Sequence, residues 1–357
     1  MCSASCQIFR FLAINASILT LCASQASAQS GGITAKTLAP RMDSGAPALF
    51  AAVPSSQTGI SFVNPIDVQH PLKRNFIAGF ACGGIAIGDV NGDGMPDIYL
   101  TGAAAPQNRL FVQKSAWKFE DVTESAKVSA AGEWSAGAAM ADIDGDGRLD
   151  IYVCNYDRPN MLFMNKTVPG GEVVFEESAK AYGLDVVDAS LMASFCDYDC
   201  DGDLDLFVHC SEYQREGGRP VEPPVIEENG KYRVIEEFEK YYTVKPDERG
   251  KQTFVNAGRT NHLFRNEGAG KKFTDVTKSA GIGVRNISNS STWWDYNQDG
   301  WLDLYVGNDF RDADQLYRNN GDGTFTDVIA NTLSHTSWFS MGADAADVNN
   351  DGLIDFL

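Results

Sequence analysis

The sequence predicts an all-β fold made of repeated four-stranded units, and three observations lead to it. A nine-residue acidic motif occurs five times, beginning at Asp89, Asp142, Asp197, Asp295 and Asp347. Each copy lies between two short segments of strand-forming residues, and a second phrase recurs between successive copies. The starts lie 53, 55, 98 and 52 residues apart, and a period of about 40–50 residues in a β-rich chain is typical of propeller blades. We therefore expect a β-propeller with four strands in each blade.

The motif has the form Asp-x-Asp/Asn-x-Asp-Gly-x-x-Asp in every copy. Oxygen-bearing side chains at positions 1, 3 and 5, followed by Gly at position 6, are typical of a Ca²⁺-binding loop. An EF-hand would need a bidentate Glu at position 12, but the residues there are Leu100, Val153, Val208 and Val306, and the fifth copy ends before that position. The fourth Asp comes at position 9 instead, so we expect a metal loop between two strands.

We expect each loop to bind one Ca²⁺, five in all, through side chains at positions 1, 3, 5 and 9 and the backbone carbonyl of position 7. The predicted ligands are Asp89, Asn91, Asp93, Met95 and Asp97 in loop 1; Asp142, Asp144, Asp146, Arg148 and Asp150 in loop 2; Asp197, Asp199, Asp201, Asp203 and Asp205 in loop 3; Asp295, Asn297, Asp299, Trp301 and Asp303 in loop 4; Asp347, Asn349, Asp351, Leu353 and Asp355 in loop 5. Loops 2 and 3 have Asp at position 3 and should bind more tightly than the others. A pliable all-oxygen cage favours Ca²⁺ over Mg²⁺.

The segments on both sides of each loop predict strands. The segments after the loops are rich in Tyr, Phe, Val and Ile and are apolar at nearly every position, as expected where both faces of a sheet are covered. They begin at residues 97, 150, 205, 303 and 355. Four of the five segments before the loops are rich in Gly, Ala or Ser, which suits closely approaching backbones.

A second phrase supplies the two outer strands of each unit. It contains Leu-Phe or Leu-Tyr, a polar turn and then a strand such as Phe-Thr-Asp-Val, and it occupies residues 108–128, 160–184, 261–282 and 314–328. The long interval between loops 3 and 4 indicates an insertion at about 211–260, which we expect to be a short helix or an excursion of the sheet.

Together the two phrases resemble the FG-GAP/VCBS repeats of integrin-α-type propellers. The pattern Leu-Phe/Tyr-x-Asn followed by Phe-x-Asp-Val-Thr resembles more narrowly the cartilage acidic protein and ASPIC/UnbV family. The resemblance covers residues 59–357 and implies a secreted propeller, seven-bladed in the full-length protein, often followed by a further small domain. We therefore interpret the chain as truncated at its C-terminal end.

Residues 1–28 predict a secretory signal, and residues 29–58 a linker. An apolar run from Phe11 to Ala23 is followed by Ala26-Ser27-Ala28, a small-residue cleavage site. The run is too short to span a bilayer, and we expect no membrane span. The predicted location is extracellular or periplasmic.

The acidic composition narrows the expected partners. The chain has 48 acidic and 29 basic residues and a net charge of −19. Much of this charge belongs to the five loops, and no basic stripe suggests nucleic acid as a partner. We expect a protein or glycan partner, with the insertion as a natural contact region. The alternatives are a scaffold for an absent C-terminal ASPIC/UnbV-type domain, and an enzyme with an axial active site, for which no catalytic residues can be nominated.

The cysteines, histidines and aromatic pairs do not indicate a catalytic or metal site. Cys154 with Cys210, or Cys196 with Cys200, could form a disulfide, but buried thiols are the favoured interpretation. The four His residues show no metal or triad spacing. Two aromatic pairs before loops 4 and 5, Trp293-Trp294 and Trp338-Phe339, predict packing or, alternatively, a ligand platform. Glycosylation acceptor sequences begin at Asn165, Asn286 and Asn289.

Overall fold

The computed structural model describes residues 50–64, 68–74, 83–103, 108–247, 249–268, 272–309 and 312–356. The chain divides into two units, Met1–Ala51 and Ala52–Leu357, and all elements given below lie in the second. The predicted signal and residues 29–49 of the predicted linker lie outside the described residues. The last linker residues form the one-turn helix α1 (Ser55–Thr58).

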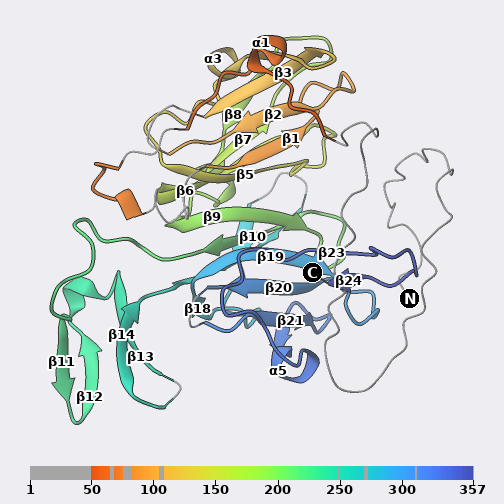
Figure 1. Cartoon of the computed structure of the whole chain (residues 1–357). Helices are drawn as coiled ribbons and strands as arrows, with labels where there is room; N and C mark the ends of the chain where they lie inside the picture. The colour runs from red at the N-terminus through yellow and green to blue at the C-terminus, as the bar shows by residue number, and fades with distance from the viewer. Residues whose placement is uncertain are drawn as a thin grey trace, which may run out of the picture. The chain divides into compact units, whose positions relative to one another are not determined.

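Four antiparallel four-stranded units, repeats 1 to 4, make up most of the described chain (Figure 1). Their inner two strands flank the acidic loops, as the sequence predicts. These strands are β1 (Ile85–Gly88) and β2 (Asp97–Leu100), β5 (Ser135–Ala141) and β6 (Asp150–Pro159), β9 (Val187–Cys196) and β10 (Asp205–Cys210), and β19 (Ser288–Trp294) and β20 (Asp303–Asn308). A fifth pair, β23 (Ala345–Ala346) and β24 (Asp355–Phe356), flanks loop 5.

The outer two strands of each repeat come from the second recurring phrase. They are β3 (Arg109–Ser115) and β4 (Lys118–Asp121), β7 (Met161–Asn165) and β8 (Phe175–Glu177), β16 (His262–Asn266) and β17 (Phe273–Asp275), and β21 (Gln315–Asn319) and β22 (Phe325–Asp327). One-turn helices that the sequence did not predict follow three of these pairs: α3 (Thr123–Ala126), α4 (Ala179–Tyr182) and α5 (Ile329–Thr332).

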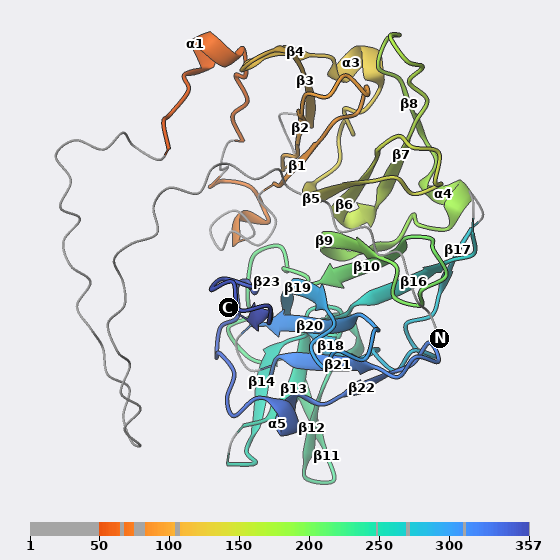
Figure 2. The ribbon, with the colours of Figure 1, turned by 90° about the vertical axis from the view of Figure 1, so that its right-hand side faces the viewer.

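The sequence left the insertion open between a helix and an excursion of the sheet, and it forms two β-hairpins. These pair β11 (Val225–Glu228) with β12 (Lys231–Val234), and β13 (Tyr242–Pro246) with β14 (Gln252–Asn256). A single 3-10 turn, η1 (Glu236–Phe238), lies between them. Figures 1 and 2 show both hairpins extending away from the four-stranded sheets. The short pair β15 (Arg259–Thr260) and β18 (Arg285–Asn286) lies where the chain returns from the insertion.

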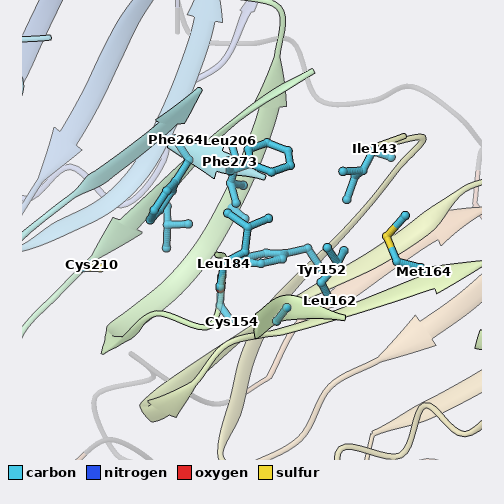
Figure 3. Packing of buried hydrophobic residues seen from close by; sticks show 14 residues of the cluster. Ile143, Tyr152, Cys154, Leu162, Met164, Leu184, Leu206, Cys210, Phe264 and Phe273 are labelled. Atoms are coloured by element: carbon cyan, nitrogen blue, oxygen red, sulfur yellow. The ribbon is translucent and has the colours of Figure 1, made fainter. Parts of the chain in front are cut away.

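The hydrophobic core lies between successive repeats, which explains why the inner strands are apolar at consecutive positions. Ile151 and Val153 of β6 pack against repeat 1, whereas Tyr152 of the same strand packs against repeat 3. Leu206 then faces Tyr152 across the repeat 2–repeat 3 junction, and Phe207 faces repeat 4. Figure 3 shows the middle junction, where side chains of β6 and β7 meet those of β10 and β16. Side chains alternate across a strand, so each inner strand contributes to two cores.

The fold is therefore all-β, with few helical residues among those described, and its stacked four-stranded repeats are consistent with a β-propeller. Repeats 2 and 3 are joined further, because the long strand β6 also pairs with β9. No helix in the described part of the chain is long and apolar enough to cross a membrane.

Candidate metal sites

Each acidic loop is a tight turn between the two inner strands, and two of its positions require unusual backbone angles. Glycine at position 6 has a positive φ in every loop, between 83° and 97°. Position 4 has a positive φ as well, and in loops 3 to 5 it is not glycine but Cys200, Gln298 or Asn350. Left-handed conformations cost non-glycine residues about 1–2 kcal/mol. The loop conformation is therefore maintained against a local cost.

The first aspartate of each loop organises the turn. One of its oxygens accepts the N–H of position 5, at 3.0 to 3.2 Å, and the other accepts the N–H of Gly at position 6, at 2.7 to 3.1 Å. The aspartate at position 5 accepts the N–H of position 7 at 2.8 to 3.0 Å. These bonds turn several carboxylates toward one small region of each loop.

The aspartate at position 9 is buried and joins the loop to the sheet. In loops 1 to 4 its side chain is at most 1% exposed. One oxygen accepts the N–H of loop position 2 at 2.9 to 3.2 Å, and the other accepts an N–H of the third strand at 2.7 or 2.8 Å. Each oxygen keeps a second lone pair, so position 9 can both hold the strands and serve as a metal ligand.

Position 3 separates loops 2 and 3 from the others. One oxygen each of Asp144 and Asp199 is buried and has no hydrogen-bond partner among the described residues. In loops 1 and 4 the corresponding Asn91 and Asn297 donate their amide to the position 5 carboxylate, at 3.1 and 2.9 Å. An asparagine at position 3 thus donates a hydrogen bond to the carboxylate at position 5. An aspartate at position 3 has no such donor, and its own buried oxygen needs an added donor or a cation.

The donor atoms of loops 2 and 3 converge closely enough to hold an ion. Ligand atoms of Asp142, Asp144 and Asp146 lie within 4.8 Å of one another, as do those of Asp197, Asp199 and Asp205. All of them are carboxylate oxygens, the donors that Ca²⁺ prefers. In loop 2 the guanidinium of Arg148 pairs with Asp146. The clustered oxygens and the orphaned atoms fit a bound cation, and Ca²⁺ itself remains a prediction.

Burial raises the pKa of the position 9 aspartates of loops 1 to 4, and the neighbouring loop carboxylates raise it further. The pKa is about 6 for Asp150 and Asp303 and about 8 for Asp205. Burial also raises the pKa of Asp144 and Asp199, and repulsion by the loop aspartates adds to it. Burial and the neighbouring carboxylates thus destabilise the charged form of these aspartates. A bound cation would offset this effect.

An asparagine at the end of the third strand binds each loop to the next repeat, which sequence reasoning missed. Asn165 of repeat 2 donates its side-chain amide to the carbonyl of Val90 in loop 1, at 2.8 Å, and to Leu149 beside its own loop, at 2.9 Å. The same pattern joins Asn266 to Ile143 and Leu204, and Asn319 to Tyr198 and Leu302. The signal was present in the recurring Leu-Phe/Tyr-x-Asn phrase.

A second side-chain bond crosses each junction at the start of the third strand. The amide of Asn108 donates to Ser135 at 2.9 Å, that of Asn160 to Ser190 at 3.1 Å, and that of Asn261 to Ser288 at 2.9 Å. In repeat 4 Asp314 replaces the asparagine and accepts from Ser340 at 2.6 Å. All four junctions therefore have a buried polar bond in addition to their apolar core.

The remaining residues that the sequence analysis singled out have other environments. Cys154, Cys196 and Cys210 are buried, and no disulfide joins the described cysteines; Cys82 lies outside them. The aromatic pairs differ: Trp293 packs edge-on against Phe207, whereas Trp338 is 66% exposed. Asn165 is only 1% exposed, so its acceptor sequence is inaccessible for glycosylation in the folded chain.

One histidine takes part in a buried ionic cluster that its sequence spacing did not predict. His262 lies 3.3 Å from Asp188, which also receives two hydrogen bonds from Arg259, at 2.6 and 3.0 Å. Burial pushes the pKa of Asp188 upward, but the bonds from His262 and Arg259 outweigh it and bring the pKa to about 2. Cys210 lies close enough to complete a metal-ligand set, yet Arg259 already neutralises the aspartate.

Comparisons with known proteins agree with this geometry. The model of the FG-GAP-like repeat family matches residues 89–153 and 295–357, which contain loops 1, 2, 4 and 5. Cartilage acidic protein 1 of Xenopus tropicalis is 29% identical over 154 residues, covering 41% of this chain and 23% of that protein. The human protein of the same name is 23% identical over 167 residues, covering 47% and 25%. The match thus spans about a quarter of these relatives.

Two segments of the chain therefore match FG-GAP-like repeats, and part of the chain is similar to cartilage acidic protein 1. A solved structure of an Agrocybe aegerita lectin, described as recognising non-reducing terminal N-acetylglucosamine, is also similar at 17% identity. It covers 77% of this chain and 74% of that chain with a TM-score of 0.36, which is too low for any inference.

Proposed function

We propose that this protein is a secreted, calcium-binding β-propeller that acts as an interaction module for a protein or glycan partner. The observation that carries the calcium part is the pair of buried, unpartnered carboxylate oxygens at Asp144 and Asp199. A native fold rarely leaves such atoms without a partner. The similarity to cartilage acidic protein 1 supports the secreted, interacting part.

The chain's own residues would hold the ion as the sequence predicts, through side-chain oxygens at positions 1, 3, 5 and 9 and the backbone carbonyl of position 7 of each loop; position 3 is a carboxylate only in loops 2 and 3. Bound Ca²⁺ supplies positive charge that offsets the mutual repulsion of these carboxylates. The aspartate at position 1 orients the turn, and the aspartate at position 9 fixes the turn to the third strand. A neutralised loop then holds its two strands and the neighbouring asparagine in place.

The test is thermal unfolding of the full chain in EDTA and in excess Ca²⁺. Binding to the folded state alone stabilises by RT ln(1 + [L]/Kd), about 2.7 kcal/mol per site when the free ion is at 100 times Kd. Several sites should therefore raise the melting temperature by many degrees in Ca²⁺. Excess Mg²⁺ serves as the matched control and should restore less. A melting temperature that is the same in EDTA and Ca²⁺ contradicts the proposal.

A further inference from the structure

A cavity of about 280 Å³ lies where the hairpin β13–β14 meets the repeats. None of its lining residues belongs to the acidic loops. The hairpin contributes Lys245, Phe254 and Asn256, and the chain on either side of it contributes Glu212 and Asp312. The insertion therefore forms one wall of a half-open cavity.

One of the lining residues, Glu212, is a buried carboxylate with one oxygen that has no hydrogen-bond partner among the described residues. Glu212 is 4% exposed. Its Oε1 atom accepts hydrogen bonds from the side-chain amides of Asn256, at 2.8 Å, and Gln214. Its Oε2 atom is buried and has no hydrogen-bond partner in the described chain. Burying an unpaired acceptor costs about 1–3 kcal/mol, so this atom points to a donor supplied by a ligand.

The carboxylate is held in position before any ligand arrives. The hydroxyl of Tyr156 donates to the backbone carbonyl of Glu212 at 3.1 Å and accepts the N–H of Gln214 at 2.6 Å. Glu212 also bridges to Gly258 across the base of the insertion. A site whose polar atoms are fixed in advance loses less entropy on binding.

The rim of the cavity presents a cation that is also held in place. The guanidinium of Arg219 lies over the ring of Phe254, 4.7 Å from its centroid, and donates to the Phe254 carbonyl. The ring of Tyr242 also packs against that of Phe254, with the two centroids 4.7 Å apart. A guanidinium has five N–H donors, so several remain available for an anion. Arg74 adds a second guanidinium to the lining.

The residues that line the cavity carry one more positive than negative charge. Lys245 pairs with Asp312, which also accepts the N–H of Ile287 at 3.0 Å. Two guanidinium groups then face a single further acid, Glu212. Burial raises the pKa of Glu212, which weakens its negative charge further. A ligand that fits must therefore combine an anionic group with a hydrogen-bond donor, and a basic peptide would be repelled.

We propose that this cavity binds a uronate, the acidic sugar unit of a glycan. The sugar carboxylate would pair with Arg219 and Arg74, since planar guanidinium groups bind carboxylates with two parallel hydrogen bonds. A ring hydroxyl would donate to Glu212 Oε2. The volume is at the lower end of the range for ligand pockets, about 300–1,000 Å³, and suits one sugar rather than a chain. The inference deepens the interaction function proposed above and rests on it.

The experiment is calorimetric titration of the full chain in Ca²⁺ with three probes: glucuronate, glucose and acetate. Glucose has the ring without the charge, and acetate has the charge without the hydroxyls. Glucuronate should bind at least tenfold more tightly than either. The variants Arg219→Gln and Glu212→Gln should each weaken binding about tenfold or more. The control Arg233→Gln, on the other hairpin and 52% exposed in its side chain, should change nothing.

Three results would overturn the proposal: no binding of glucuronate, equal binding of glucose or acetate, or undiminished binding to Arg219→Gln. The last result would mean that the sugar carboxylate binds calcium at the loops instead. Arg219 is exposed, so Arg219→Gln should fold normally. If Glu212→Gln does not fold, Arg219→Gln is sufficient to test the proposal. Because the melting experiment concerns the loops only, failure of this inference and failure of the calcium proposal are distinguishable.

Discussion

Replacing Asp199 with asparagine should stabilise the protein in the absence of calcium and change its stability little in the presence of calcium. One oxygen of Asp199 is buried without a hydrogen-bond partner among the described residues. Burial raises the pKa of Asp205, and the charge of Asp199 helps to bring it to about 8. The variant makes loop 3 resemble loop 4, where the amide of Asn297 donates to Asp299 at 2.9 Å. Removing an unsatisfied buried acceptor is worth about 1–3 kcal/mol, so the variant should be more stable in EDTA by about 1–2 kcal/mol.

Calcium should erase that advantage. Extracellular loops of this kind bind with Kd of roughly 10⁻⁴–10⁻³ M, so about 10 mM Ca²⁺ stabilises a site with Kd near 10⁻⁴ M by about 2.7 kcal/mol. If one lost carboxylate weakens binding about tenfold, the calcium-dependent gain falls by about 1.4 kcal/mol. Urea unfolding of both proteins in EDTA and in Ca²⁺ measures these four free energies.

The matched control is Glu172→Gln, which removes one negative charge from an exposed turn of repeat 2. It should change stability equally in both conditions. If Asp199→Asn instead destabilises the protein by the same amount in EDTA and in Ca²⁺, the carboxylate acts independently of any ion, and the physical basis of the calcium proposal is lost.

Three further predictions concern a bond at a repeat junction, the Asp188 cluster and the reactivity of the cysteines. Asn319→Ala removes one hydrogen bond across the repeat 3–repeat 4 junction, to Tyr198, and one within repeat 4, to Leu302, and should lower the free energy of unfolding by about 2–3 kcal/mol, measured by urea unfolding against wild type. Asp188 has a lowered pKa of about 2, so its stabilisation is complete above pH 4 and is lost as the pH falls from about 4 to 2. Asp188→Asn lacks this carboxylate, so its stability should fall less than that of the wild type between pH 4 and pH 2. Because Arg259 loses its charged partner in the variant, the variant should be less stable than the wild type at neutral pH. In native protein a thiol reagent should modify exposed Cys200 before buried Cys154, as followed by mass spectrometry; equal rates would contradict the burial.

The loops and their strands were predictable because their signals are local. The alternation of Asp and Gly within nine residues requires both the turn and the charge cluster, and the strands on each side follow from a few apolar residues. The consecutive apolar positions 151 to 153 correctly indicated a strand covered on both faces, as the packing of Ile151 and Tyr152 confirms. Pairings such as β1 with β2 need only a short turn.

The features that could not be predicted depend on residues distant in the chain. Asn165 bonds to a carbonyl 75 positions earlier, and its acceptor sequence pointed wrongly to a surface site. His262 meets Asp188 because its strand, β16, pairs with β10, which in turn pairs with β9. The cavity around Glu212 requires the insertion, the turn after β10 and the start of repeat 4 to meet. The periodicity and composition of the sequence do not indicate which distant residues come into contact.

The asparagine bonds change what calcium binding should stabilise. Loop 3 supplies the carbonyl of Tyr198 that Asn319 of repeat 4 binds, while Asp205 of the same loop accepts the backbone N–H of Asn266 in repeat 3. A change in loop 3 therefore reaches both repeats at once. In repeat proteins, stability is approximately the sum of each repeat's own stability and the terms for its interfaces. Charge repulsion in a calcium-free loop should accordingly weaken an interface as well as a hairpin, so that loss of the ion loosens neighbouring repeats together.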